Sequence, residues 1–179
     1  MSKNVRKICL WAVGIALFVV LSMCLQVPVF ENYYLCLGYI VMAVYCYSFG
    51  TPGGTVVGVL GTVLYCVVIS GLRGMPGWAL GNIVIGILLG RAFSLTAPMK
   101  RGERMAVCAV VIIAACAAGI LGVKSLTEKI LYGQPFLLRV GKNMTAFIAD
   151  AAVLILSLPI CEVLARPAAN LFPELAVRR

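Results

Sequence analysis

The sequence predicts an all-α integral membrane protein, a bundle of about six transmembrane helices with both termini cytoplasmic. The first observation is composition, because 63% of the 179 residues are hydrophobic and the mean hydropathy is +1.06. The second is charge, because only 12% of the residues are charged, whereas a soluble domain has about a quarter. The third is length, since apolar runs of membrane-spanning size follow one another and leave little chain for a soluble domain.

The apolar runs and the breaks between them define the expected spans. A basic stretch precedes the first run, as in a signal peptide, but this run exceeds the usual signal core of about 7–15 residues. Because more apolar runs follow, we expect a first transmembrane helix there. A turn rich in glycine and proline at residues 50–54 separates the second span from the third. The expected spans lie within a single domain of residues 1–179, at about 8–27, 34–49, 54–72, 77–95, 105–123 and 143–165.

The longer connection at residues 124–142 carries a helix signal of its own. Ser125 and Glu128 match a capping box, in which the first side chain caps a helix and the second reaches back to its first amide. The pattern predicts a short amphipathic helix on the outer face, ended by Gly133 and followed by an irregular stretch. This helix is either an interfacial anchor or part of a lid over a pocket.

The distribution of lysine and arginine predicts the orientation, because cytoplasmic connections are enriched in basic residues. With the N-terminus inside, ten basic residues lie in the cytoplasm and five outside, which favours cytoplasmic termini. The inner set is Lys3, Arg6, Lys7, Arg91, Lys100, Arg101, Arg104, Arg166, Arg178 and Arg179. The outer set is Arg73, Lys124, Lys129, Arg139 and Lys142.

Several functional classes are excluded by what the sequence lacks. It has no histidine, which removes histidine-based zinc sites and Ser-His-Asp triads, and its eight cysteines form no CxxC pair. It has no P-loop motif for binding ATP. The net charge of +9 resides in the connections, which indicates contact with lipid headgroups and not with nucleic acid. We therefore expect no enzyme activity, no cofactor and no metal site.

The fourth expected span carries a polar and aromatic face near its outer end. Spaced four apart along this face are Trp78, Asn82, Gly86 and Gly90. The two glycines suit close helix packing, while Asn82 must find hydrogen bonds about a turn below the interface. With Arg73 in the preceding turn, the outer half of this face is interpreted as one wall of a small-molecule site. Alternatively, Trp78 is an interfacial anchor, Asn82 a helix–helix contact and Arg73 a headgroup-facing charge.

The last expected span has a second polar stripe, which should face the bundle interior. Its members are three or four residues apart: Asn143, Phe147, Asp150, Leu154, Ser157 and Cys161. Asp150 is an acid in the outer half of this expected span, so it is functional, protonated or satisfied by a buried partner. Lys142 and Asn143 lie at the outer mouth of this span.

These features converge on the outer half of the bundle, together with the connection after the first span. A cavity lined by aromatic residues and a few convergent polar groups is the usual form of a small-ligand site. Arg73 and Lys142 suggest carboxylate or phosphate oxygens on the ligand, and the aromatic residues suggest a ring. The expected substrate-binding residues are Phe30, Tyr34, Arg73, Trp78, Asn82, Lys142, Asn143, Phe147 and Asp150.

The first expected span holds Ala12 and Ala16, two small residues four apart in its cytoplasmic half. Such a pair lets another helix approach closely, either within this bundle or from a partner. Six short spans, cytoplasmic termini, this alanine pair and the Pro-Gly-Trp-Ala-Leu-Gly-Asn run at residues 76–82 resemble one known family. The family is that of the substrate-binding S components of energy-coupling factor (ECF) transporters.

The resemblance implies a multi-pass protein of a bacterial-type plasma membrane that captures a vitamin or related micronutrient on the outer side. It implies delivery by toppling in the membrane, docked through Ala12 and Ala16 on a scaffold membrane subunit with two cytoplasmic ATPases. Lys142 and Asn143 resemble a pair in flavin-type members but differ in order and spacing. The ligand therefore stays open among riboflavin, folate, pantothenate, another vitamin and a nucleobase-like compound.

Two other functions remain as alternatives. The first is a stand-alone proton-coupled secondary transporter of a small organic solute, in which Asp150 titrates. Inverted repeats would support it, and the sequence contains no convincing one. The second is a structural subunit with no ligand.

Overall fold

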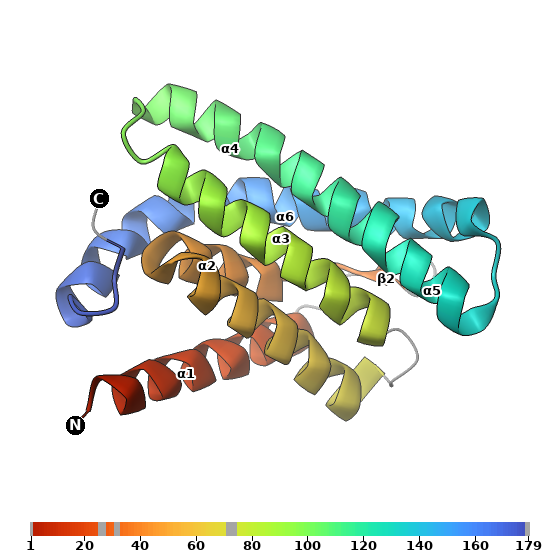
Figure 1. Cartoon of the computed structure of the whole chain (residues 1–179), viewed down its shortest axis with the longest axis horizontal. Coiled ribbons are helices and arrows are strands. Elements are labelled where there is room, and N and C mark those ends of the chain that lie inside the picture. Colours follow the sequence, from red (N-terminus) through yellow and green to blue (C-terminus); the bar gives the residue numbers. More distant parts are fainter. Residues whose placement is uncertain (1, 25–27, 31–32, 71–74, 178–179) are drawn as a thin grey trace.

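The computed structural model describes residues 2–24, 28–30, 33–70 and 75–177, with the backbone alone at 28–30, 33–34 and 70. The described chain is almost entirely helical (Figure 1). Its elements are α1 (Lys3–Cys24), β1 (Pro28–Phe30), β2 (Tyr33–Tyr34), α2 (Gly38–Tyr65), η1 (Cys66–Ser70), α3 (Met75–Leu95), α4 (Arg101–Cys116), η3 (Ala117–Lys124), α5 (Ser125–Tyr132) and α6 (Phe136–Leu171). The η segments are short π-helices that continue the helices before them.

The expected turn at residues 50–54 is a sharp bend inside α2. Gly50 has φ 77° and ψ −175°, a backbone conformation that is essentially restricted to glycine, and it divides α2 into two helical halves. A Cβ added at Gly54 would lie 2.7 Å from the backbone nitrogen of Cys46, and one at Gly58 would lie 2.5 Å from the sulfur of Met42. These approaches pair residues at equal distances from the bend, so the two halves run antiparallel in contact.

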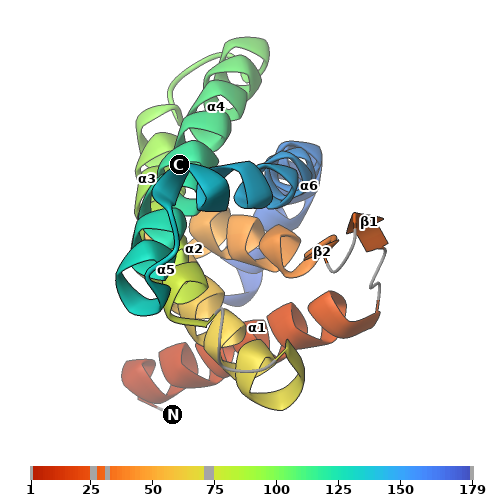
Figure 2. The ribbon, with the colours of Figure 1, turned by 90° about the vertical axis from the view of Figure 1, so that its right-hand side faces the viewer.

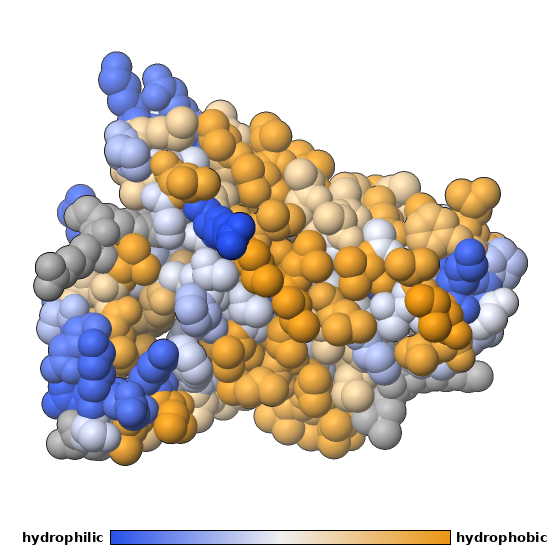
Figure 3. Space-filling view, viewed as in Figure 1, coloured by the Kyte–Doolittle hydropathy of each residue, from blue (hydrophilic) through white to orange (hydrophobic). Residues whose placement is uncertain are grey.

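Five helices within the described ranges are long and apolar enough to cross a membrane. One of them is residues 38–69, which contains the bend at Gly50. The termini lie at one end of the molecule, where Arg6 and Glu174 form an ion pair of 3.5 Å (Figure 1). The bend at Gly50 lies at this same end, since the backbone N–H of Val177 donates to the Ser48 carbonyl over 2.9 Å. Charged residues gather at this end, and an apolar band covers the middle of the molecule (Figure 3).

The second span begins later, and the fifth span ends later, than the sequence predicts. Tyr33 and Tyr34 belong to a strand that pairs with β1, so α2 begins at Gly38 and not at residue 34. The fifth span does not end at residue 123, because α4, η3 and α5 form one continuous helical stretch, Arg101–Tyr132.

The predicted capping box is wrong for the same reason. Residue 124 is already helical and its side chain makes no cap hydrogen bond, while the Ser125 hydroxyl donates to the carbonyl of Ile120 over 3.3 Å. Gly133 does end the helix, with φ 64°. The irregular stretch expected before the last span is also wrong, because Pro135 precedes a helix that runs from Phe136 to Leu171.

The expected packing role of the glycines in the fourth span is confirmed. A Cβ at Gly86 would lie 2.8 Å from the Cα of Thr55, and one at Gly90 would lie 2.5 Å from the Cα of Thr51. Real Cβ atoms essentially never come this close, so α3 and the second half of α2 touch backbone to backbone. This contact fixes the position of the polar residues one and two turns earlier on α3.

Candidate functional site

The candidate site lies at the end of the bundle away from the termini. The short β1–β2 ribbon contacts α6, and α5 contacts both α3 and α6. Figure 2 looks onto this end, where the ribbon, α5 and the beginnings of α2 and α6 surround one region. The elements that the sequence expectation assigned to a ligand pocket therefore come together.

A chain of hydrogen bonds links α3 to both halves of α2. The indole Nε1 of Trp78 donates to the Tyr39 hydroxyl over 2.9 Å, and this hydroxyl donates to Oδ1 of Asn82 over 2.7 Å. Nδ2 of Asn82 donates to Oγ1 of Thr62 over 2.6 Å and to the carbonyl of Gly58 over 3.3 Å. The Trp78 ring also packs edge-on against the ring of Tyr65, with centroids 5.8 Å apart.

This arrangement makes Asn82 a helix–helix contact, one of the two interpretations that its position allowed. The side chain is 0% exposed, and both ends of its amide are occupied by α2. Trp78 is half-buried, so it forms the part of this wall that a ligand could touch. The hydrogen bond from Trp78 to Tyr39 holds the indole in place.

A second polar cluster joins α5 to α6. Nδ2 of Asn143, 1% exposed, donates to Oγ of Ser125 and to Oε2 of Glu128, both over 3.0 Å. Nε of Arg139 lies 3.2 Å from the same Glu128 oxygen, an ion pair. Among the described residues this buried Nε has no hydrogen bond of acceptable geometry, so it is paired by charge alone. Glu128 thus lies inside a helix long enough to cross a membrane and not in a connection.

Asp150 lies deeper on α6 and is buried. The positive charge that acts on its carboxylate, among the described residues, is that of Lys124, which also interacts with Glu128. The sequence left three possibilities for this acid, and the structure places the charge of Lys124 within electrostatic range of it. A carboxylate in an apolar bundle costs several kcal/mol unless it is paired, and the charge of Lys124 offsets part of that cost.

The two clusters form one continuous region. Tyr39, which belongs to the first cluster, lies within electrostatic range of the Asp150 carboxylate. Gly77, at the beginning of α3, packs against Lys124, since a Cβ there would lie 3.1 Å from the Lys124 carbonyl oxygen and 3.2 Å from its Cγ. We call this region the outer polar cluster, because it lies at the end that the sequence analysis expects to be outside. It is defined by Tyr39, Trp78, Asn82, Lys124, Glu128, Arg139, Asn143 and Asp150.

The structure describes the other expected site residues to different extents. Arg73 lies outside the described residues, and Phe30 and Tyr34 are described by their backbone alone, in strands that contact α6. Lys142 is exposed, and its carbonyl accepts a 3.3 Å hydrogen bond from Thr145. Phe147 is partly buried against the main core.

The polar stripe of the last span faces the bundle interior, as expected. Exposed fractions are 0% for Leu154, Ser157 and Cys161, and 6% for Asp150. The Ser157 hydroxyl donates to the carbonyl of Leu154 over 2.6 Å, so it is satisfied within its own helix.

Sequence reasoning missed four members of the outer polar cluster. Tyr39 gave no signal beyond its place in an aromatic-rich run. The sequence analysis treats Lys124 and Arg139 as charges of a connection, and Glu128 as a capping residue, because it predicts a separate short helix there and not a continuation of the fifth span. Lys124 and Glu128 are four residues apart, so they lie on one face if the helix is continuous. This spacing is the one signal in the sequence that could have indicated their interaction.

The alanine pair on α1 points away from the bundle. Ala12 and Ala16 are both exposed, whereas Gly14 is buried and a Cβ there would lie 2.6 Å from the ring of Tyr45. Their exposure argues against packing within this bundle, the alternative interpretation of the pair. The two alanines leave a shallow strip beside the larger exposed side chains of Val13 and Leu17.

We compared the sequence and the fold of this chain with those of known proteins. The sequence matches the family model described as ECF-type riboflavin transporter, S component, over residues 2–166. A search of curated proteins found no match. Among solved structures, the fold is similar to the crystal structure of the S-component for biotin from an ECF-type ABC transporter, with a TM-score of 0.63 and 16% identity. That match covers 93% of this chain and 95% of the other.

Proposed function

Because the chain belongs to the family of ECF-type riboflavin transporter S components, we propose that it captures a vitamin on the extracellular side and delivers it with an ATP-driven energising module. Membership makes the chain a membrane-integral, vitamin-specific transporter subunit and not an enzyme. The match over residues 2–166 is the observation that carries the proposal. The residues and contacts described above support its finer parts.

We propose six membrane crossings, with the two halves of α2 on either side of Gly50 crossing separately. The antiparallel contact between these halves supports this count. Both termini and the bend at Gly50 then share one side. The excess of basic residues in the connections at that end favours the cytoplasm of a bacterial-type cell, which places the outer polar cluster at the extracellular end.

We propose that the vitamin binds against the outer polar cluster, between α3, α6 and the ribbon after α1. Trp78 and Phe147 offer aromatic surface for a ring, and Asp150 with Lys124 offers both signs of charge for polar substituents. Lys142 and Arg73 would meet an anionic group at the mouth. Riboflavin is the first ligand to test, because the matching family model describes riboflavin transporters.

The experiment that tests capture uses the purified chain. Small molecules that co-purify with it are released by denaturation and identified by mass spectrometry, and a vitamin panel is then screened for a shift of the unfolding temperature. We expect one vitamin to be retained and to raise the unfolding temperature. Absence of any retained vitamin, with no shift across the panel, would overturn the proposal.

We propose that Ala12 and Ala16 dock the scaffold membrane subunit of the energising module. Their exposure and the absence of bulk at both positions support this role. Ala12→Arg with Ala16→Arg should abolish uptake in cells that supply the module while leaving vitamin binding unchanged. Ala106→Arg, at an exposed alanine of α4, is the matched control and should leave uptake unchanged. Loss of vitamin binding in the alanine variant would mean that the pair supports the fold instead.

The secondary-transporter alternative is not favoured by the family match. Asp150, its proposed proton carrier, interacts with the charge of Lys124. The discriminating test is uptake by this chain alone in liposomes under a proton gradient, which we expect to be absent.

A further inference from the structure

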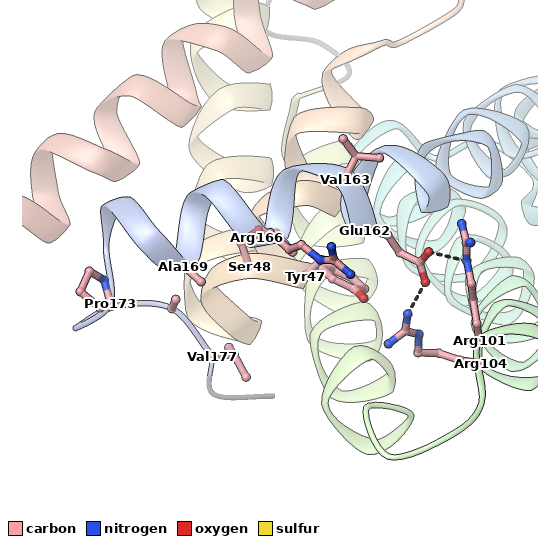
Figure 4. Close-up of a pocket in the computed structure, with 12 residues that line it drawn as sticks. Tyr47, Ser48, Arg101, Arg104, Glu162, Val163, Arg166, Ala169, Pro173 and Val177 are labelled. Atoms are coloured by element: carbon pink, nitrogen blue, oxygen red, sulfur yellow. Dashed lines mark hydrogen bonds and ion pairs between the residues drawn. The ribbon is translucent and has the colours of Figure 1, made fainter.

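A large cavity opens at the end of the bundle opposite the outer polar cluster. Its volume is about 1090 Å³, and it lies between the second half of α6, the beginning of α4, the region just before Gly50 and the C-terminal tail (Figure 4). The tail covers it from one side, held by the Val177 hydrogen bond to Ser48 and by contact of the Phe172 and Phe49 rings, 6.2 Å apart. The proposed vitamin site makes no use of this cavity.

The cavity is lined by cations in excess. Arg101, Arg104 and Arg166 line it, against one acid, Glu162. Glu162 forms an ion pair with Nε of Arg101 at 2.8 Å and another with Arg104. One carboxylate thus orients two guanidinium groups, each of which keeps further N–H donors. Arg166 is exposed and forms no ion pair with any described acid, so the lining carries two positive charges beyond what Glu162 neutralises.

A buried polar group in the same lining lacks a partner. Ser48 is 4% exposed, and among the described residues its hydroxyl oxygen makes no hydrogen bond. A buried hydroxyl without a partner destabilises the fold, and a hydrogen bond to a ligand oxygen at this position would remove that cost. Arg104 also lies over the ring of Tyr47, with its guanidinium carbon 5.8 Å from the centroid, so its position is fixed from two sides.

We propose that this cavity binds a phosphate group, carried either by an anionic lipid headgroup of the adjacent leaflet or by a soluble phosphate ester. Arginine forks match phosphate oxygens in geometry and charge, and the Ser48 hydroxyl adds a neutral donor beside them. Basic pockets between transmembrane helices on the cytoplasmic side are suited to anionic headgroups. Under the proposed orientation, the cavity lies on that side. The site is separate from the vitamin site, so either proposal can fail without the other.

The first arm of the test uses the full chain in nanodiscs of phosphatidylcholine with phosphatidylglycerol, and native mass spectrometry counts the phosphatidylglycerol retained. We expect Arg166→Gln to lower its retention about fivefold, and Arg104→Gln combined with Arg166→Gln about twenty-five-fold. Arg91→Gln is the matched control, because Arg91 is an exposed arginine of the same cytoplasmic set that does not line the cavity. Since Arg166 is exposed, its variant keeps the test valid even where the double variant folds poorly.

The second arm titrates inorganic phosphate and glycerol 3-phosphate against the chain in neutral micelles. Binding of lipid alone identifies a headgroup site, and binding of the soluble ions identifies a phosphate-ester site. Either result, lowered by Arg166→Gln and not by Arg91→Gln, supports the proposal. Absence of both, or equal effects of the two variants, would overturn it. So would loss of assembly with the energising module in Arg166→Gln without any dependence on phosphate, because the cavity would then accept an acidic protein side chain.

Discussion

Asn82 offers the sharpest test of how the outer polar cluster is built. The structure places its amide between the two halves of α2, whereas the sequence also allowed a direct ligand contact. Asn82→Leu keeps the branched shape and most of the volume while removing all three of its hydrogen bonds, those with Tyr39, Thr62 and Gly58. The change thus separates bonding from packing.

The expected magnitude follows from those three bonds. A hydrogen bond between membrane helices contributes about 0.6 kcal/mol on average, which gives about 2 kcal/mol for the three. The Tyr39 hydroxyl would also lose its acceptor in a buried place, which adds about 1 kcal/mol. Asn82→Leu should therefore lower the free energy of unfolding by about 2–3 kcal/mol.

The measurement is reversible unfolding in mixed micelles, followed by tryptophan fluorescence. Asn170→Leu, the same substitution at an exposed position, is the control and should change the free energy of unfolding by less than about 0.5 kcal/mol. In a double-mutant cycle, Tyr39→Phe and Asn82→Leu should couple by about 0.6–1.7 kcal/mol. If Asn82→Leu left stability unchanged and abolished vitamin binding, the amide would be a ligand contact and our interpretation would be wrong.

Three further changes test other contacts. Gly90→Val brings side-chain atoms against the Thr51 backbone and should cost about 1–3 kcal/mol of stability or more. Its control is Gly102→Ala, whose added Cβ has no atom within 4 Å and which should be neutral or slightly stabilising. Thermal unfolding measures both. Lys124→Met removes the positive charge that acts on Asp150 and should lower the free energy of unfolding by up to about 3 kcal/mol. This is the lower end for a broken buried pair, because Lys124 is only partly buried. Adding Asp150→Asn to the same chain should restore most of the lost stability. Trp78→Phe keeps an aromatic ring but removes the N–H that donates to Tyr39, and should weaken vitamin binding about two- to tenfold in a fluorescence titration. Trp11→Phe, the same substitution at the other tryptophan, should leave binding unchanged.

The fold class and the general organisation could be predicted because they depend on composition and periodicity. A hydrophobic run of membrane length, a glycine-proline break at residues 50–54 and a stripe of polar residues on the last span each specify local structure by themselves. Gly86 and Gly90 behaved as expected because a glycine pair four apart has few uses other than close helix approach. The alanines of α1 could be located but not oriented, since their exposure depends on which face Gly14 and its neighbours bury.

The connections could not be predicted as well, because local signals there compete with continuation of a helix. Ser125 and Glu128 satisfy the capping pattern, yet the π-helical turns of η3 carry the chain through without a break. Because the helix is continuous, Lys124 and Glu128 lie in the bundle and not in a connection. There Lys124 interacts with Asp150, and Glu128 accepts a hydrogen bond from Asn143. Such partnerships between distant segments have no signature in a single sequence.

Our central claim is that the chain alone captures a vitamin at the outer polar cluster, and a fluorescence titration of the purified protein tests it most directly. Riboflavin is added first and the rest of a vitamin panel follows, with quenching of the ligand or of Trp78 as the signal. The account predicts saturable binding of one vitamin per chain that Trp78→Ala weakens and Arg91→Gln leaves unchanged. Absence of saturable binding by every member of the panel would contradict the account.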